Sequence, residues 1–289
     1  MKALGIDIGG TKIYAAVVNE KGVIISDIEK YSTPKSRQEI EFTLKKVINK
    51  YETDIDVIGI STAGAINNEN TKVLGSTGNL CSDYPQIDFM SLSSRKVVLE
   101  NDANCAAWAE YKLGAAKGCE NIVVLTLGTG VGGGIIVNGK LLKGKNGAAG
   151  EMHFKMNREN KRKCTCGAYD CFEIYASGNG LKITAQEISK NPDITTYDVV
   201  AGVKNNDELS INILNVWQDD IINGIVGLAN IFDPDCVVLS GSMAQFVDYD
   251  KITNDVNKKI VTTPTRVIPA VFENNAGLVG AAVLALEKI

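Results

Sequence analysis

The stretch NIVVLTLGTGVGGGIIVNGKLL, residues 121–142, decides the fold of this chain of 289 residues. Residues 122–127 form an apolar strand, and residues 135–137 begin a second strand that leads into an Asn-Gly hairpin turn. The glycines between the strands have the G-x-G-x-x-G spacing, at Gly128, Gly130 and Gly133. In a Rossmann dinucleotide site this spacing opens a helix, whereas here it joins two strands. The sequence therefore excludes a Rossmann site, and it contains no Walker A loop either.

The N-terminus repeats this strand–turn–strand pattern at a constant offset of 119 residues, so that Gly9 corresponds to Gly128. Residues 3–8 and 13–18 are apolar strands, and the turn GGTK lies between them. Residues 23–28 are the predicted third strand of this N-terminal meander. The repeat predicts two sheet domains of similar topology that face each other across a cleft.

The rest of the chain alternates between predicted helices and strands. Apolar residues at helical spacing predict helices over 36–51, 102–113, 178–190, 209–232, 251–260 and 277–288. Short β-branched runs predict further strands over 56–61, 96–100, 236–239 and 266–271. The predicted fold class is therefore α/β.

Composition and charge exclude several classes of protein. The chain has 34 acidic and 30 basic residues and a formal net charge of −4, so it lacks the basic excess that holds a nucleic-acid backbone. No apolar run approaches the roughly 18 residues of a membrane span, and the first ten residues do not read as a signal peptide. We therefore expect a cytoplasmic protein with no nucleic-acid or membrane partner. In that reducing compartment the seven cysteines are thiols or metal ligands.

The two glycine turns are candidate phosphate-binding loops. Glycine removes the side chains that would keep a polyanion from the backbone N–H groups. The alternative is that these hairpins simply need glycine. Asp7 lies in an apolar strand beside the first turn, where a carboxylate without a partner is unfavourable, and a Mg²⁺ ion carried by a nucleotide is a natural partner. Lys12 lies either near the phosphates or in solvent.

Asn101 and Asp102 follow a buried strand and begin a helix. One interpretation of Asp102 is an ordinary helix N-cap. The other is a general base that accepts a hydroxyl proton during phosphoryl transfer and is kept ionised by the helix N-terminus. The residues alone leave both interpretations open.

A group of cysteines marks a candidate metal site. Cys164, Cys166 and Cys171 lie within the eight residues CTCGAYDC, and the single histidine, His153, lies eleven residues before the first of them. Three thiolates and one imidazole are a common set of structural zinc ligands. The alternative is a reduced, cysteine-rich surface loop.

Taken together, these segments resemble the ROK family of sugar kinases, within the actin-like ATPase superfamily. The matches run in order along nearly the whole chain, as DIGGTK (7–12), ENDANCAAWAE (100–110), LGTGVGGGIIVNGKLLKG (127–144), GAAGE (147–151), CTCGAYDCFE (164–173), FDPDCVVLSGSMA (232–244) and GLVGAAVLA (277–285). The resemblance implies two ribonuclease-H-like α/β domains around a central cleft. The small domain would comprise residues 1–120, completed by the C-terminal helix at 276–289, and the large domain residues 121–275.

The resemblance also implies ATP-dependent phosphorylation of a hexose, usually at the 6-hydroxyl, with Mg²⁺ and a structural Zn²⁺. Asp102 would be the general base. The sugar would be bound by Asn79, Asn101, Asp102, Glu151, His153 and Glu173. Mg·ATP would be bound by Asp7, Gly9, Gly10, Thr11, Lys12, Gly128, Thr129 and Gly130, with Gly241 near the adenosine. Zinc would be bound by His153, Cys164, Cys166 and Cys171. Because the family usually forms dimers, we expect a homodimer.

Two residues depart from the family pattern. The family sequence G-E-x-G-H has histidine three residues after the glutamate, whereas His153 comes two residues after Glu151 and Phe154 occupies the expected position. Either the loop bulges so that His153 reaches the metal, or zinc has three thiolates and another ligand. The second departure is Asp170, where the family usually has glycine.

The substrate is less narrowly indicated than the reaction. Glucose is the first expectation and N-acetylmannosamine the second, with fructose and allose behind them. The repressors of the family carry a helix-turn-helix domain before the first phosphate loop, and this loop begins at residue 7, so we expect a kinase. The rival from another class is a non-catalytic sensor that binds sugar and zinc.

Overall fold

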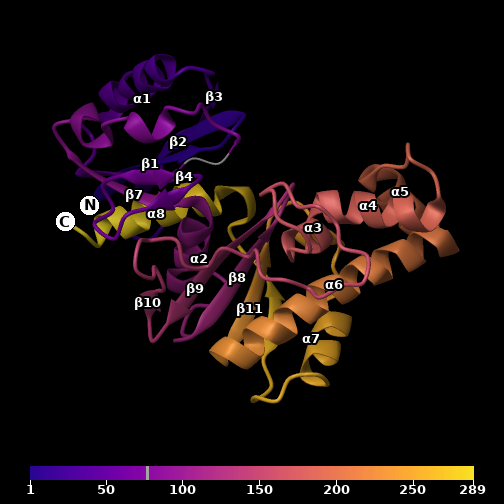
Figure 1. The fold of residues 1–289 in the computed structure, drawn as a ribbon. Helices are drawn as coiled ribbons and strands as arrows, with labels where there is room; N and C mark the ends of the chain where they lie inside the picture. Colours follow the sequence, from indigo (N-terminus) through magenta and orange to yellow (C-terminus); the bar gives the residue numbers. More distant parts are fainter. Residues whose placement is uncertain (76–77) are drawn as a thin grey trace. The chain divides into compact units, whose positions relative to one another are not determined.

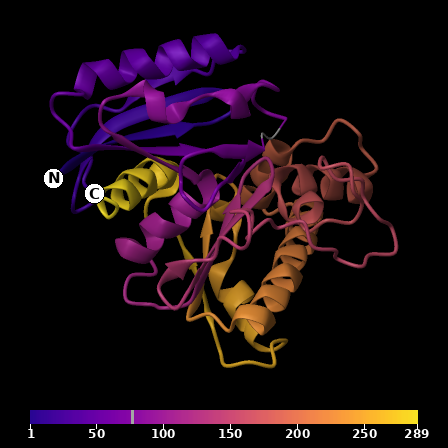
Figure 2. The same cartoon turned by 60° about the vertical axis from the view of Figure 1, so that its left-hand side comes forward.

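The computed structural model describes residues 1–75 and 78–289, which form two compact units (Figure 1). Unit 1 consists of Met1–Gly118, Gly134–Gly150 and Val271–Ile289. Unit 2 consists of Cys119–Gly133 and Glu151–Ala270. Both chain ends belong to unit 1 and lie side by side (Figure 2). Each unit is therefore built from segments that are distant in the sequence.

The first sheet has five strands in the order β3-β2-β1-β4-β7. The strands are β1 (Lys2–Ile8), β2 (Lys12–Asn19), β3 (Glu29–Ser32), β4 (Val57–Thr62) and β7 (Lys96–Asn101). β1 and β2 form an antiparallel hairpin around the first glycine turn, while β1, β4 and β7 are parallel. Every residue of β4 is buried, as expected for a parallel strand covered on both faces.

Helices pack on this sheet. α1 (Arg37–Tyr51) contributes one apolar face to the same core cluster as β1. α8 (Ala276–Leu286) lies against β1, β4 and α2 (Asp102–Lys112). The approach is close, because a Cβ at Gly59 of β4 would overlap the carbonyl oxygen of Ala281 in α8. Since α8 is buried between strands and a second helix, it is apolar all round.

The second sheet has the corresponding order β10-β9-β8-β11-β12. The strands are β8 (Ile122–Leu127), β9 (Val131–Val137), β10 (Lys140–Leu141), β11 (Cys236–Ser240) and β12 (Arg266–Pro269). β11 pairs in parallel with β8 and β12, and β9 and β10 form an antiparallel hairpin. Each hairpin with a glycine turn thus occupies the same place in its sheet. The predicted repeat and the α/β class are confirmed.

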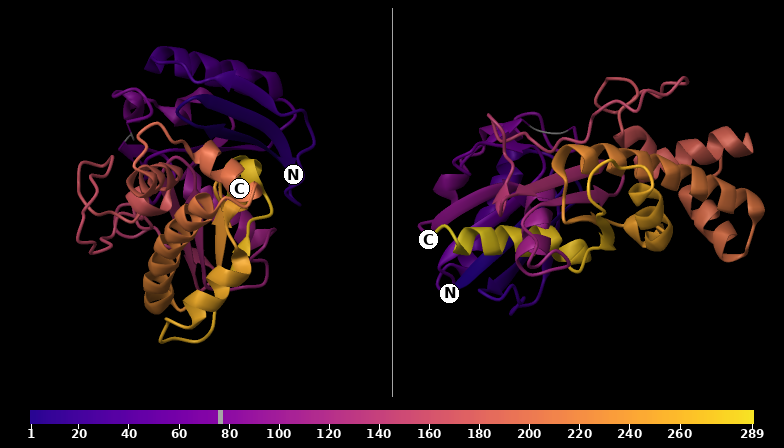
Figure 3. Two further views of the ribbon diagram at one scale, coloured as in Figure 1. Left: turned by 90° about the vertical axis from the view of Figure 1, so that its right-hand side faces the viewer. Right: turned by 90° about the horizontal axis from the view of Figure 1, so that it is seen from below.

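The helices of unit 2 pack around α6 (Glu208–Phe232), which has 25 residues (Figure 3). Its neighbours are α3 (Glu173–Ala176), α4 (Gly178–Ser189), α5 (Thr196–Lys204) and α7 (Tyr249–Asn257). The buried indole N–H of Trp217 in α6 donates to the carbonyls of Ala176 and Ser177, at 3.1 Å each. This bond fixes α6 to the junction of α3 and α4.

The short elements complete the description. β5 (Ala65–Ile66) and β6 (Val73–Gly75) form a two-stranded sheet. Single 3₁₀ turns span Tyr84–Gln86, Phe89–Leu92, Ala244–Phe246 and Glu273–Asn275. Among the residues that the structure describes, no helix combines the length and the apolar character needed to cross a membrane.

The predicted strand over residues 23–28 is wrong, because β3 begins only at Glu29. In the preceding segment Ile24 forms an isolated bridge to Val18. The next ladder position is filled by a side chain, since the Ser26 hydroxyl accepts the backbone N–H of Val17 at 2.9 Å. A side chain that replaces a backbone partner ends regular pairing.

Candidate functional site

The carboxyl ends of three parallel strands bring the N-terminal site residues of unit 1 together. In the register of the first sheet, Asp7 of β1 lies beside Ser61 of β4, and Ser61 lies beside Glu100 of β7. Asn101 and Asp102 follow at the end of β7 and the start of α2. Because parallel strands end at the same edge, residues separated by almost a hundred positions become neighbours.

Asp7 has a side-chain partner, the hydroxyl of Ser61, which donates to Asp7 Oδ1 at 2.6 Å. Burial raises the pKa of Asp7 to about 6, and the nearby carboxylate of Asp102 adds to this rise, while the Ser61 hydrogen bond opposes it. Two acidic groups therefore interact at this edge. Such a pair favours a bound cation, which removes the repulsion between them.

Asn101, not Asp102, is the N-cap of α2. Its Oδ1 accepts the backbone N–H groups of Ala103 and Asn104, at 3.0 and 3.2 Å. Its Nδ2 donates to the carbonyl of Gly64 at 3.1 Å. The capping interpretation therefore applies to Asn101, and Asp102 occupies the first position of the helix.

Asp102 presents a carboxylate that is accessible to solvent. Its Oδ1 accepts the N–H of Ala103 at 2.8 Å. The surrounding protein raises the pKa of Asp102 by desolvation, and backbone hydrogen bonding from Ala103 lowers it in part. In its ionised form this carboxylate can accept a proton.

The first glycine turn is closed by the backbone bond from Gly9 N–H to the Lys12 carbonyl, at 2.9 Å. The Thr33 hydroxyl donates to the Gly9 carbonyl at 2.6 Å, and its N–H donates to the Thr11 carbonyl at 3.0 Å. Asn79 lies against Gly10, because a Cβ on Gly10 would be 2.7 Å from the Cβ of Asn79. Lys12 is exposed at the start of β2. The structure thus places Asn79 beside the first turn.

The second glycine turn belongs to unit 2, with the bond from Gly128 N–H to the Gly130 carbonyl at 3.0 Å and Thr129 exposed at its tip. The Gly128 carbonyl accepts the N–H of Gly178, the first residue of α4, at 2.8 Å. Gly241 has a positive φ of 88° and packs on the backbone of Leu127, where a Cβ would overlap the carbonyl. Gly241 therefore packs beside the strand that ends at the second glycine turn.

Glu173 connects the second glycine turn to the cysteine loop. Its Oε2 accepts the backbone N–H of Val131 at 3.2 Å, and a Cβ on Gly130 would overlap this carboxylate oxygen. Its Oε1 accepts the hydroxyl of Thr165 at 2.8 Å and the thiol of Cys164 at 3.4 Å. Gly130 is thus a glycine because the carboxylate needs the space.

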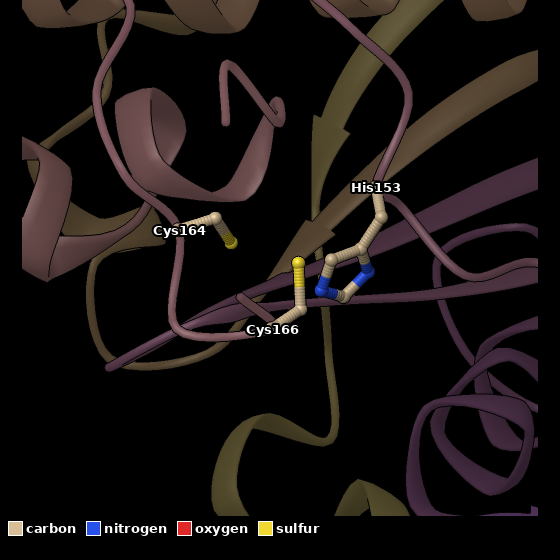
Figure 4. Close-up of side chains that lie close together, drawn as sticks. All are labelled: His153, Cys164 and Cys166. Atoms are coloured by element: carbon tan, nitrogen blue, oxygen red, sulfur yellow. The ribbon is translucent and has the colours of Figure 1, made fainter. Parts of the chain in front are cut away.

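The histidine and the cysteines converge in unit 2 (Figure 4). The candidate ligand atoms of His153, Cys164 and Cys166 all lie within 4.8 Å of one another. The Sγ atoms of Cys166 and Cys171 are 3.6 Å apart. In a tetrahedral zinc site with bonds of about 2.3 Å, sulfur atoms lie about 3.8 Å apart, close to the separation of Cys166 and Cys171. Cys171 is not part of the group of three whose donor atoms all lie within 4.8 Å of one another.

The ring of Phe154 stacks on Phe172, with centroids 4.9 Å apart and an interplanar angle of 13°. Phe172 is fully buried. Met152 is buried, whereas His153 is partly exposed and lies close to the thiols of Cys164 and Cys166. Glu151 is exposed, with a carboxylate oxygen 3.8 Å from His153 Nδ1.

Asp170 supports the cysteine loop from a left-handed conformation, with a φ of 66°. Its buried carboxylate accepts the hydroxyl of Tyr175 at 2.9 Å and the N–H of Arg158 at 3.3 Å. Asp and Asn tolerate this conformation better than most residues, which explains how Asp replaces the usual glycine. Gly167, with a φ of 87°, closes the tip of the loop, and its N–H donates to the carbonyl of Cys164 at 3.0 Å.

Ser61, the partner of Asp7, is a site residue that was not predicted from the sequence. The signal was present, because the strand DVIGIS ends in a hydroxyl residue at the edge where Asp7 lies. The acceptor role of Glu173 toward Val131 was not predicted either. No sequence signal gave that contact, since it depends on how the cysteine loop packs on the second glycine turn.

Three comparisons with known proteins agree with this arrangement. A family model described as the ROK family matches residues 3–288. A glucokinase from Streptomyces coelicolor is 33% identical over 98% of this chain and 97% of its own. An N-acetylmannosamine kinase from Yersinia pseudotuberculosis is 31% identical over 100% of this chain and 99% of its own. A solved ROK family glucokinase from Streptomyces griseus, in complex with glucose and AMPPNP, has a TM-score of 0.81 and 29% identity, covering 99% of this chain and 100% of that one.

Proposed function

The chain belongs to the ROK family, and we propose that it is an ATP-dependent sugar kinase that phosphorylates a hexose. The observation that carries the proposal is the placement of Asp7 and Asp102 at one edge of the first sheet, where their carboxylates interact. In such a pair, one carboxylate can bind a metal–phosphate group and the other can activate a hydroxyl nucleophile. The similarity to glucokinases and to an N-acetylmannosamine kinase supports the sugar as acceptor.

Asp102 is the proposed general base. Its accessible carboxylate takes the proton of the acceptor hydroxyl, usually the 6-hydroxyl, as the hydroxyl oxygen bonds to the γ-phosphorus of ATP. The bond from that phosphorus to the bridging oxygen breaks, and ADP leaves. Its position in the first turn of α2 favours the charged form of the carboxylate before the reaction.

Asp7 is the proposed carboxylate of the magnesium site, and the two glycine turns are the proposed phosphate loops. When bound, Mg²⁺ neutralises charge on the phosphate oxygens. The backbone N–H groups of the turns donate to phosphate, while Gly241 leaves room for the adenosine. The residues proposed to bind Mg·ATP are Asp7, Gly9, Gly10, Thr11, Lys12, Gly128, Thr129, Gly130 and Gly241.

Glucose is the proposed substrate, with N-acetylmannosamine as the second candidate. Carboxylates and amides suit vicinal hydroxyls, because each accepts or donates more than one hydrogen bond. The residues proposed to bind the sugar are Asn79, Asn101, Asp102, Glu151, His153 and Glu173. Asn101 also caps α2, and Glu173 also accepts the N–H of Val131. In the proposal these two residues bind the sugar in addition to their partners within the protein.

The proposed structural zinc site comprises His153, Cys164, Cys166 and Cys171. It is supported by the close donor atoms of the first three and by the short distance from Cys166 to Cys171. Zinc would stabilise the loop by joining its three thiolates to the imidazole. The cytoplasm, as a reducing compartment, is the proposed location, because it keeps these thiols available. A homodimer is the proposed assembly, which light scattering of the purified protein tests.

The test of this function is the consumption of ATP with a panel of hexoses and hexosamines, followed by identification of the phosphorylated sugar. The proposal expects one or a few sugars to be phosphorylated, with glucose first. A non-catalytic sensor would bind a sugar without consuming ATP. The absence of ATP consumption with every sugar, in a preparation that binds AMPPNP and sugar, would refute the kinase.

A further inference from the structure

The carboxylate of Glu100 is the centre of a buried polar cluster directly before Asn101 and Asp102. Its side chain is 1% exposed. Oε1 accepts the backbone N–H of Asn101 at 2.9 Å and Nδ2 of Asn104 at 3.1 Å. Oε2 accepts Nδ2 of Asn70 at 2.8 Å and Nζ of Lys143 at 2.8 Å. These four bonds use the acceptor capacity of the carboxylate.

Lys143 supplies the positive charge of the cluster from a distant segment of unit 1. It follows β10, and its side chain is 15% exposed. Besides Glu100, its Nζ donates to the carbonyl of Asn67 at 3.0 Å. Lys288, near the C-terminus, donates to Oδ1 of Asn70 at 2.6 Å. Two cations from distant parts of the chain therefore hold the groups around Glu100.

A buried ion pair such as Lys143–Glu100 contributes more to the positions of the groups around it than to the stability of the fold. A buried ion pair gains little over a well-packed apolar pair, because both charges lose their hydration. A carboxylate binds N–H donors about twice as strongly as a neutral acceptor does. The Asn101 N–H is one of those donors. The pair thus strengthens a bond at the residue where β7 ends and α2 begins.

We propose that Glu100, held by Lys143, is a positioning residue for phosphoryl transfer. It fixes the backbone of Asn101 and the first turn of α2, and so sets the direction in which Asp102 presents its carboxylate. This inference rests on the proposed function, in which Asp102 is the general base. Glu100 and Lys143 act through Asp102 and do not themselves touch a substrate.

The first test compares Lys143→Met and Lys143→Arg in steady-state kinetics, at a temperature where circular dichroism finds each variant folded. Displacing a catalytic group by about 1 Å costs up to about a hundredfold in rate. We therefore expect kcat of Lys143→Met to fall by about ten- to a hundredfold, with KM for ATP nearly unchanged. Lys143→Arg, which keeps the charge and the donors, should recover most of kcat. The matched control is Lys112→Met, which removes the half-exposed ion pair of α2 with Glu287 and should keep the wild-type kcat.

A double variant covers the case in which Lys143→Met does not fold. Glu100→Gln with Lys143→Met leaves no buried charge without a partner, which relieves the main reason for misfolding. Its amide group would face the donors of Asn70 or Asn104, so the bond to Asn101 is no longer fixed and kcat should stay low. A wild-type kcat in either the single or the double Met variant would overturn the positioning role.

The outcome for Asp102→Asn keeps the two proposals apart. An inactive Asp102→Asn together with a fully active Lys143→Met would refute the positioning role and leave the proposed function standing. An Asp102→Asn variant with substantial turnover would refute Asp102 as the base and, with it, any positioning that acts through Asp102.

Discussion

The carboxylate of Glu173 accepts the backbone N–H of Val131 at 3.2 Å and so joins the cysteine loop to the second glycine turn. The same side chain accepts the Thr165 hydroxyl at 2.8 Å, so both of its oxygens are engaged. A Cβ at Gly130 would overlap this carboxylate and displace it from the turn. A change at Glu173 is therefore transmitted to both the candidate nucleotide site and the candidate metal site.

Replacing Glu173 by Ala should raise KM for ATP by about tenfold or more, because a hydrogen bond to a charged group contributes about 1.5–3 kcal/mol. Glu173→Gln should have a smaller effect, since its amide oxygen still accepts the Val131 N–H. Steady-state kinetics with ATP and sugar varied separately measure both. The control is Glu187→Ala, which removes an exposed carboxylate of α4 in the same unit. An effect confined to KM for the sugar would contradict this coupling.

Asp7 should make the stability of the protein depend on pH. Its pKa is raised from 3.8 to about 6, so the native protein keeps this proton over a range in which the unfolded chain has released it. The stabilising contribution of the protonated form is complete below about pH 4 and is lost as pH rises from about 4 to about 6. Asp7→Asn stays neutral and removes this dependence.

The measurement is the melting temperature of Asp7→Asn minus that of the wild type, without divalent metal, at a series of pH values. The difference should rise between pH 4 and pH 6 and stay constant above that range. Asp193→Asn, on an exposed loop, controls for the loss of a carboxylate in general. A difference for Asp7→Asn that does not change with pH would show that this carboxyl is not buried in the protonated form.

His153 should be a ligand of the bound zinc. His153→Ala should lower zinc affinity by more than the roughly 10- to 100-fold that the loss of an outer-sphere partner costs, because a direct ligand is removed. Competition with a chromogenic chelator measures the affinity, and metal analysis of the wild type gives the stoichiometry. Cys81→Ser, a thiol outside the loop, is the control. Equal affinity in His153→Ala and the wild type would mean that another group completes the ligand set.

The close approach of α8 to the first sheet should make Gly59 intolerant of any side chain. A Cβ there would overlap the Ala281 carbonyl, so Gly59→Ala should destabilise the protein by about 1–3 kcal/mol through overpacking. Gly227→Ala is the matched control, because a Cβ on this helical glycine meets no atom within 4 Å and Ala has the higher helix propensity. It should stabilise the protein by roughly 0.5–1 kcal/mol. Urea unfolding measures both, and equal effects would contradict the packing of α8.

The sequence predicted the fold well because the fold is repeated. A constant offset of 119 residues identified the two hairpins, and the matching sheet orders confirmed them. The strand over 23–28 was wrong because its apolar side chains have no buried face: Val23, Ile25 and Ile28 are 43–52% exposed. α5 was missed, since only Val199 of that helix is buried and its apolar pattern is weak. The domain boundaries near residues 120 and 275 remain a proposal.

Less of the candidate site could be predicted, because the roles of its residues depend on side-chain contacts between segments that are distant in the sequence. From the sequence alone, it was open whether His153 could reach the cysteines. In the structure His153 lies close to the thiols of Cys164 and Cys166, while Phe154 stacks on Phe172. The sequence also left Asp102 as either cap or base, and the hydrogen bonds of Asn101 assign the cap to the preceding residue. Both outcomes depend on side-chain orientation, which residue spacing alone does not contain.

The most direct test of the central claim is the turnover of Asp102→Asn, measured as sugar phosphate formed per enzyme at saturating ATP and sugar. We predict that kcat falls by about 10²- to 10⁴-fold, because the variant keeps the shape of the side chain but cannot accept the hydroxyl proton. Sugar binding, measured by calorimetry on the same sample, should remain close to that of the wild type. A kcat within about tenfold of the wild type would contradict the claim that Asp102 is the general base.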